Sequence, residues 1–133
     1  MPAGDQRKPV VLLVEDEALI ASFLTRALAQ AGCEVLGPFA HPDAALRALD
    51  KATTTVDCAI LDGRLAGGQT SLPVAQRLHD TAIPFLFLTG FGSVTDIGAG
   101  RFPEIQILQK PVRLATLLAE VQALLGRTAG PSE

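Results

Sequence analysis

The fold is decided by one stretch of the sequence, Val10-Val11-Leu12-Leu13-Val14-Glu15-Asp16. Five consecutive β-branched and aliphatic residues indicate a strand that is buried on both faces, as strands of parallel sheets are. Two acidic residues then end the apolar run. In residues 17–31 the apolar side chains recur at the spacing of one helix face, and Gly32 fits a left-handed cap for that helix. The pattern predicts a strand and a helix with two carboxylates at their junction.

The same alternation continues along the chain. Further strands are expected at 34–39, 56–61, 85–88 and 105–108, and further helices from Pro42, at 71–81 with Pro73 in the first turn, and at 112–125. A helix within 93–103 should be short or irregular, because two glycines and several β-branched residues weaken it. Strands that alternate with helices call for right-handed βαβ units. The expected fold is therefore α/β, a doubly wound five-stranded parallel sheet with helices on both faces.

Length and composition narrow the class of protein. A chain of 133 residues fits one domain, expected at 9–126 between flexible tails at 1–8 and 127–133. The 48% hydrophobic content and net charge of -3 exclude disorder, and the apolar runs are too short for a membrane span. No signal peptide is visible, so we expect a cytoplasmic protein in which Cys33 and Cys58 are free thiols. The scattered basic residues and the absence of Trp and Tyr argue against nucleic-acid binding.

Polar side chains stand where the predicted strands end. Glu15 and Asp16 follow the first strand, Asp62 the third, Thr89 the fourth and Lys110 the fifth. Because ligands of parallel α/β sheets bind at the carboxyl ends of the strands, these groups should meet at one edge. Three clustered carboxylates repel one another, and a hard divalent cation such as Mg²⁺ relieves that repulsion. The ammonium group suits a phosphoryl oxygen, so the edge is predicted to hold Mg²⁺ and a phosphoryl group.

Each element alone has an ordinary structural explanation. Acidic residues before a helix favour its macrodipole, and Asp62 before Gly63 is typical of a turn. Thr89-Gly90 also suits a turn, and Lys110-Pro111 suits the entry to a helix. All of these would have to coincide at strand ends in the right order, so a single site is the better explanation.

In that order and spacing, the five positions resemble the receiver domains of response regulators in bacterial two-component systems, over about residues 9–126. The resemblance implies a flavodoxin-like sheet with strand order 2-1-3-4-5. It implies that Mg²⁺ is bound by Glu15, Asp16, Asp62 and the backbone carbonyl of Arg64.

The resemblance also assigns roles in phosphoryl transfer. Asp62 would be the phosphoacceptor, Thr89 the switch hydroxyl and Lys110 the residue that pairs with the phosphate. A carboxylate is a competent nucleophile for this chemistry, which depends on positioning and charge neutralisation. The donor would be a histidine kinase or a histidine phosphotransfer protein. Since no acid–base machinery for a hydrolase is evident, we expect a phosphorylatable switch and not an enzyme.

No output domain follows residue 126, so we expect a stand-alone response regulator, a monomer or weak homodimer, that signals by binding a downstream protein. Two other interpretations stay open. The domain could be a phosphate sink or shuttle in a phosphorelay, or a pseudo-receiver that binds a partner regardless of phosphorylation. A flavodoxin-like nucleotide binder is less well supported, because no Gly-rich phosphate loop follows the first strand.

The sequence departs from the usual receiver pattern at several positions. Ile107 stands where receivers usually carry an aromatic residue three positions before the lysine, and the loop 63–68 lacks the common Met-Pro pair. Thr89-Gly90-Phe91 resembles a subgroup of mostly single-domain receivers associated with phosphorelays such as general stress control. We expect Phe91 to repack in place of the missing aromatic, and residues 90–103, the fifth strand and the last helix to form the partner surface.

Overall fold

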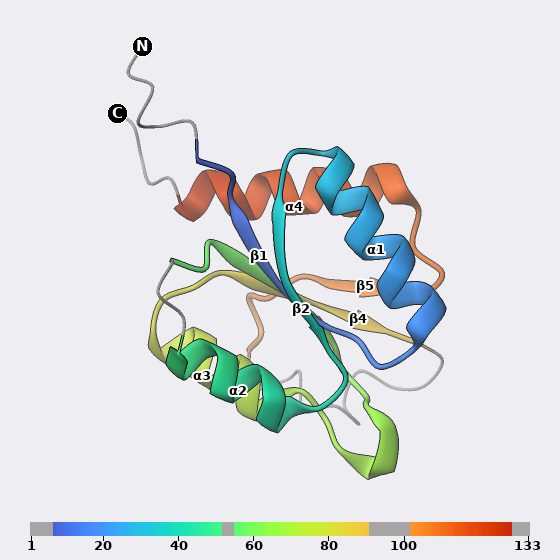
Figure 1. Ribbon diagram of the computed structural model, residues 1–133, viewed down its shortest axis with the longest axis vertical. Helices are drawn as coiled ribbons and strands as arrows, with labels where there is room; N and C mark the ends of the chain where they lie inside the picture. The colour runs from blue at the N-terminus through green and yellow to red at the C-terminus, as the bar shows by residue number, and fades with distance from the viewer. Residues whose placement is uncertain (1–6, 52–54, 91–101, 129–133) are drawn as a thin grey trace.

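The computed structural model describes residues 7–51, 55–90 and 102–128. In these residues, strands and helices alternate as the sequence predicts (Figure 1). The elements are β1 Val10–Val14, α1 Ala18–Gln30, β2 Glu34–Phe39, α2 Pro42–Lys51, β3 Cys58–Asp62, α3 Leu72–Asp80, β4 Phe85–Thr89, β5 Ile107–Gln109 and α4 Leu114–Thr128, with a 3₁₀ turn at Ala66–Gly68. The helix expected within 93–103 falls mostly on residues 91–101, which lie outside the described part of the chain.

All neighbouring strands pair in parallel, in the order β2-β1-β3-β4-β5, which confirms the predicted doubly wound sheet. The chain builds outward from β1 in one direction through β2 and in the other through β3. The carboxyl ends of β1 and β3 therefore lie side by side, with Val14 opposite Leu61. This is the switch point of the strand order, where sheets of this type bind ligands.

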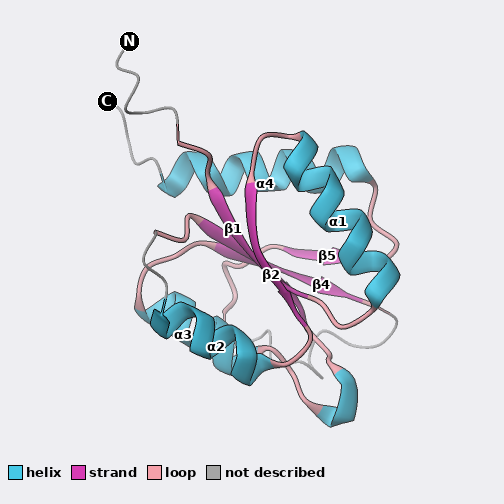
Figure 2. Cartoon of the chain, in the orientation of Figure 1, coloured by secondary structure: helices cyan, strands magenta, loops and turns pink. Residues whose placement is uncertain are grey.

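The two faces of the sheet are covered by separate helix layers (Figure 2). Side chains alternate along β1, so that Leu12 packs with α2 and α3 on one face, and Leu13 packs with α1 and α4 on the other. Figure 1 shows α1 and α4 together on one side of the sheet and α2 and α3 on the opposite side. Every residue of β1, β3 and β4 is buried, as the continuous apolar runs predict.

Most element boundaries agree with the sequence prediction to within two or three residues. Gly32 has a φ of 91° two residues after the end of α1, the left-handed conformation expected of a helix cap. Pro42 begins α2, and Pro73 lies in the first turn of α3. The prediction of β5 at 105–108 is wrong in its start: the strand begins at Ile107, because Ile105 lies in a bend where its N–H bonds to the carbonyl of Phe102.

Candidate functional site

Three carboxylates meet at the switch point of the sheet. Glu15 and Asp16 follow β1 directly, and Asp62 is the last residue of the adjacent strand β3. One ligand oxygen from each of these three side chains lies within 4.8 Å of the other two. The structure thus brings together the three acids that the sequence places at strand ends.

Burial of these acids follows from their place at the ends of the two central strands. The side chain of Glu15 is fully buried, and that of Asp62 is almost so. The backbone holds Glu15 in place from both sides: its N–H donates to the Phe39 carbonyl at 2.9 Å, and its Oε2 accepts from the N–H of Glu17 at 3.1 Å. A buried carboxylate needs such partners, because desolvation of a charge is expensive.

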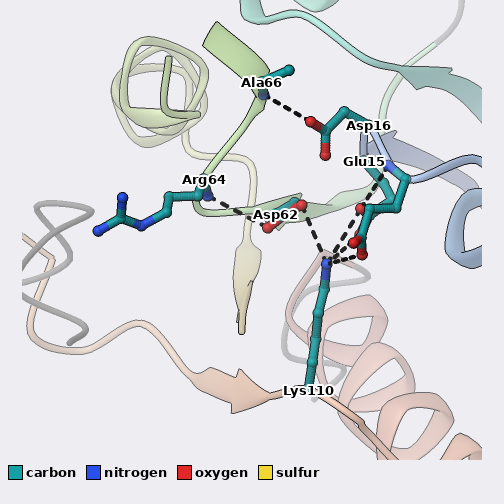
Figure 3. Close-up of polar contacts among 7 residues, drawn as sticks. Glu15, Asp16, Asp62, Arg64, Ala66 and Lys110 are labelled. Carbon is teal, nitrogen blue, oxygen red and sulfur yellow. Dashed lines mark hydrogen bonds and ion pairs between the residues drawn. The ribbon is translucent and has the colours of Figure 1, made fainter. Parts of the chain in front are cut away.

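Lys110 provides the positive charge of the site. It comes directly after β5, and its N–H donates to the Thr89 carbonyl, which anchors the residue to the end of β4. Its Nζ lies 3.0 Å from Glu15 Oε1 and 3.2 Å from Asp62 Oδ2 (Figure 3). Burial would lower the pKa of Lys110, but the neighbouring Glu15 and Asp62 outweigh that effect and raise it, so the ammonium stays charged.

One ammonium does not balance the acids around it. Burial, together with the neighbouring Glu15, raises the pKa of Asp62 to about 7, although Lys110 opposes the shift. Glu15 Oε1 lies close to the ammonium but outside hydrogen-bonding geometry, which leaves a buried oxygen without a hydrogen bond. A hard divalent cation prefers carboxylate oxygens and would relieve both conditions. The residues present therefore fit the Mg²⁺ site that the sequence predicts.

The loop after β3 forms one wall of the site. Asp16 Oδ2 accepts a hydrogen bond of 2.7 Å from the N–H of Ala66, and Asp62 Oδ1 accepts a longer one of 3.4 Å from the N–H of Arg64. In Figure 3 the Arg64 side chain points away from Asp62. The predicted metal role of Arg64 concerns its backbone carbonyl, and that role stays a prediction.

A cavity of about 550 Å³ opens over the carboxylates. Asp16, Asp62 and Lys110 line it together with Gly90. Thr89, the last residue of β4, is buried directly beside Gly90; its role as the switch hydroxyl, which the resemblance to receiver domains implies, stays a prediction.

The site also includes Glu17, to which the sequence assigned no role. Glu17 directly follows Glu15 and Asp16, and its Oε1 lies 3.4 Å from Lys110 Nζ. The run of three acids was the available signal. The hydrogen bond from Ala66 was also missed, and nothing in the sequence indicates it.

An aromatic residue, Phe102, lies in the same cluster as Ile107. Ile107 is half-buried and packs on the α2–α3 face of the sheet. Phe102 is buried there, edge-on to Phe85 with ring centroids 5.7 Å apart. Phe91, which we expected to replace the missing aromatic, lies outside the described residues.

Comparison with known proteins agrees with this geometry. The family model of the response regulator receiver domain matches residues 11–122, and the chain belongs to that family. The solution structure of SdrG from Sphingomonas melonis Fr1 is 34% identical, covers 91% of this chain and 98% of that chain, and has a TM-score of 0.72. The receiver domain of a modulated diguanylate cyclase from Desulfovibrio desulfuricans G20 is 30% identical, with coverage of 92% and 97% and a TM-score of 0.79.

A receiver domain protein (CheY-like) from Methanospirillum hungatei JF-1, at 18% identity, coverage of 92% and 97% and a TM-score of 0.79, has the same fold. No match was found among curated proteins.

Family membership fixes the general role of the chain. It is a receiver domain of two-component signalling, a non-enzymatic signalling module that implies a kinase or phosphotransfer partner. Its acidic triad is typical of a receiver magnesium site. Across the described residues, no helix combines the length and the apolar character needed to cross a membrane.

Proposed function

We propose that Asp62 accepts a phosphoryl group and that the domain acts as a response regulator. The observation that carries the proposal is the position of Lys110 Nζ, 3.2 Å from Asp62 Oδ2 in a cavity that also exposes Asp16. A nucleophilic carboxylate with an ammonium group beside it can both attack phosphorus and stabilise the charge of the transferred group.

The proposed step is a displacement at phosphorus. An oxygen of Asp62 forms the new P–O bond, and the P–N bond to the donor histidine breaks, so that the imidazole leaves and takes a proton from water. With a small acyl phosphate as donor, the P–O bond to the acyl group breaks and a carboxylate leaves. The Lys110 ammonium pairs with the oxygens of the transferred group.

Glu15, Asp16, Asp62 and the backbone carbonyl of Arg64 would hold the Mg²⁺ ion. When bound, the ion supplies positive charge to the phosphoryl oxygens. The Thr89 hydroxyl would donate a hydrogen bond to the phosphoryl group and so report its presence to the end of β4.

The direct test is incubation with Mg²⁺ and acetyl phosphate, followed by intact mass. The wild type should gain one phosphoryl group, and Asp62→Asn should gain none. Asp57→Asn is the matched control, because it removes a buried aspartate at the opposite end of β3. Equal labelling of wild type and Asp62→Asn would reject the assignment of Asp62.

A second test concerns the metal ligands. Titration with Mg²⁺, followed by NMR shifts, should show binding to the wild type that is lost or much weakened in Asp16→Asn. Asp43→Asn, which removes an exposed carboxylate on α2, should bind as the wild type does. Binding should also weaken at low pH, since protons compete for the ligand oxygens. An unchanged affinity of Asp16→Asn would contradict its assignment as a ligand.

A protein donor is favoured by the surface of α1 beside the cavity. Leu19 and Phe23 lie one turn apart on this helix and are 87% and 51% exposed. Glu17, which directly precedes this helix, and Ile20 in its first turn line the cavity. Exposed apolar side chains at the entrance to a phosphoacceptor suit a histidine kinase or a histidine phosphotransfer protein, whose histidine has to reach Asp62.

For the output, we propose that the phosphorylated domain binds a downstream protein, with β5 and α4 in the contact surface. The 90–103 part of that surface, which includes Phe91, is mostly outside the described residues. The motif Thr89-Gly90-Phe91 supports membership of the Thr-Gly-aromatic subgroup of receivers.

We also propose that the domain spans residues 9–126. We propose that the protein is located in the cytoplasm and is a monomer or a weak homodimer.

Amide hydrogen exchange with and without beryllofluoride tests the output surface. Changed protection in β5 and α4 supports a phosphorylation-dependent surface. Unchanged protection throughout, with Asp62 still phosphorylated, favours the phosphate sink or shuttle. A domain that is never phosphorylated but still binds a partner would be the pseudo-receiver.

A further inference from the structure

Glu17 occupies a position in the site that its place in the fold does not require. It is the N-cap residue of α1, with φ of −85° and ψ of 114°, but its side chain makes no capping hydrogen bond. The shorter side chains preferred at this position, such as aspartate, accept a hydrogen bond from a free N–H of the first helical turn. In this protein Glu17 Oε1 lies instead 3.4 Å from Lys110 Nζ, across 93 residues of sequence.

We propose that Glu17 is a positioning residue that holds Lys110 in the resting site and competes with the phosphoryl group for it. The proposal rests on the proposed function of Asp62, and adds a residue that restrains the transfer.

The competition follows from how differently the partners of Lys110 are buried. The side chain of Glu15 has no exposure, so in the metal-free site it cannot release the ammonium without leaving a buried charge unpaired. The side chain of Glu17 is 60% exposed, and water can replace its ion pair at little cost. Glu17 is therefore the partner that Lys110 can exchange for a phosphoryl group.

The exchange has a direction. A phosphoryl group on Asp62 carries more negative charge than the carboxylate and offers several strong acceptor oxygens, so it attracts the ammonium more strongly than Glu17 does. The Glu17 ion pair therefore competes with the phosphoryl group for the Lys110 ammonium. Loss of the Glu17 ion pair should therefore make phosphorylation faster.

The test measures the rate of phosphorylation by acetyl phosphate at saturating Mg²⁺. We expect Glu17→Gln to react about two- to fivefold faster than the wild type, the range that an exposed ion pair allows. Glu34→Gln is the matched control: it removes the same charge from an exposed residue at the opposite end of the sheet, and should react at the wild-type rate. A Glu17→Gln rate equal to or below the wild-type rate would overturn the proposal.

Glu17→Asp separates positioning from net charge. The shorter side chain keeps the carboxylate but draws it back from Lys110, so it should react at a rate close to that of Glu17→Gln. A wild-type rate for Glu17→Asp would show that charge at the cavity mouth, and not the ion pair, is responsible, and would overturn the proposal.

A double-mutant cycle with Lys110→Ala tests whether Glu17 affects the rate through Lys110. If Glu17 acts through the lysine, Glu17→Gln should change the rate in the wild type but not in Lys110→Ala. A persistent effect in the absence of the lysine would contradict the proposal. The ¹⁵N shift of the Lys110 side chain should also change in unphosphorylated Glu17→Gln, a readout that a purely structural role of Glu17 would leave unmoved.

These measurements distinguish a failure of the function proposed for Asp62 from a failure of the role proposed for Glu17. If no adduct forms on the wild type, the function proposed for Asp62 fails. If the wild type is labelled on Asp62 but Glu17→Gln gives no faster labelling, only the role of Glu17 fails.

Discussion

Two buried aspartates stand at opposite ends of the same strand, and their environments differ in almost every respect. Asp57 precedes β3 and is 6% exposed, and Asp62 ends β3 and is 4% exposed. Burial on its own raises the pKa of a carboxyl group. Yet the pKa of Asp57 lies below its usual value, and that of Asp62 is raised to about 7.

The difference comes from the partners. At Asp57, burial is outweighed by the Arg7 guanidinium, which donates two hydrogen bonds of 3.1 Å, and by the N–H of Val10 at 2.8 Å. At Asp62, burial is reinforced by Glu15, and one shared ammonium does not compensate. The neighbouring groups of each aspartate, and not its degree of burial, therefore determine the direction in which its pKa shifts. The charge of Asp57 is compensated by its partners, whereas that of Asp62 is not fully compensated by Lys110, as the metal-dependent phosphoacceptor role proposed for Asp62 requires.

Removing the structural aspartate should have the largest effect. Asp57→Ala leaves the buried Val10 N–H without its acceptor, and we expect it to lower the free energy of unfolding by about 2–3 kcal/mol. Urea denaturation measures this. Asp50→Ala, which breaks the exposed pair with Arg77, is the control and should cost less than about 1 kcal/mol. Equal losses in the two variants would mean that the Asp57 contacts stabilise no more than a surface pair.

The same kind of change at the other end of the strand should have the opposite sign. In magnesium-free buffer, Asp62→Asn removes a carboxylate from a crowded acidic site, and we expect it to raise the free energy of unfolding by about 1–2 kcal/mol. Saturating Mg²⁺ should stabilise the wild type but not the variant, because the ion binds only the folded wild-type site. Destabilisation of metal-free Asp62→Asn would show that its charge is fully compensated by Lys110.

The two residues should also dominate different parts of the pH profile. Because the folded pKa of Asp62 is raised, the metal-free folded state binds more protons than the unfolded state between about pH 4 and pH 7, and stability falls as pH rises through that window. Because the folded pKa of Asp57 is lowered, its contribution is complete above its unfolded pKa and is lost as pH falls further.

Urea midpoints across this pH range separate the two contributions. Asp62→Asn should remove the fall in stability toward neutral pH. Asp57→Asn should reduce the loss of stability at acidic pH (the acid limb). A neutral-pH decline that persists in Asp62→Asn would assign it to another group.

The smallest expected effect is that of Arg7→Gln. The Arg7 side chain is 58% exposed, so water can replace its hydrogen bonds, and Val10 still donates to Asp57. We expect a stability loss smaller than that of Asp57→Ala, and an acid limb moved to higher pH, because the pKa of Asp57 rises without the guanidinium. A loss as large as that of Asp57→Ala would make Arg7, and not Val10, the partner that matters.

The fold could be predicted because its signals are local. The runs in β1, β3 and β4 are apolar throughout, and those three strands are buried throughout. The site acids could be predicted because they follow such strands directly. The start of β5 could not, since Ile105-Gln106-Ile107 has the alternation of a strand and only the bend at Ile105 excludes its first residues.

The polar contacts of the site and of the structural aspartate Asp57 join residues that are far apart in the sequence. Arg7 meets Asp57, Asp16 meets Ala66, and Glu17 meets Lys110, at separations of 50, 50 and 93 residues. Which of several acids takes a shared lysine depends on the exact approach of two loops. Residue types alone do not contain that information.

The separation of the core by the sheet has an evolutionary consequence. The side chains of the α1–α4 face and those of the α2–α3 face form two apolar clusters, and each strand residue contributes to only one of them. Because the two clusters share no residue, substitutions in one should add independently to those in the other in their effect on stability. The helix layer that carries Leu19 and Phe23 can therefore change to suit a new partner while the opposite layer keeps the domain folded. Because the sheet separates the two layers, the surface that recognises a partner and the core that stabilises the domain can evolve independently.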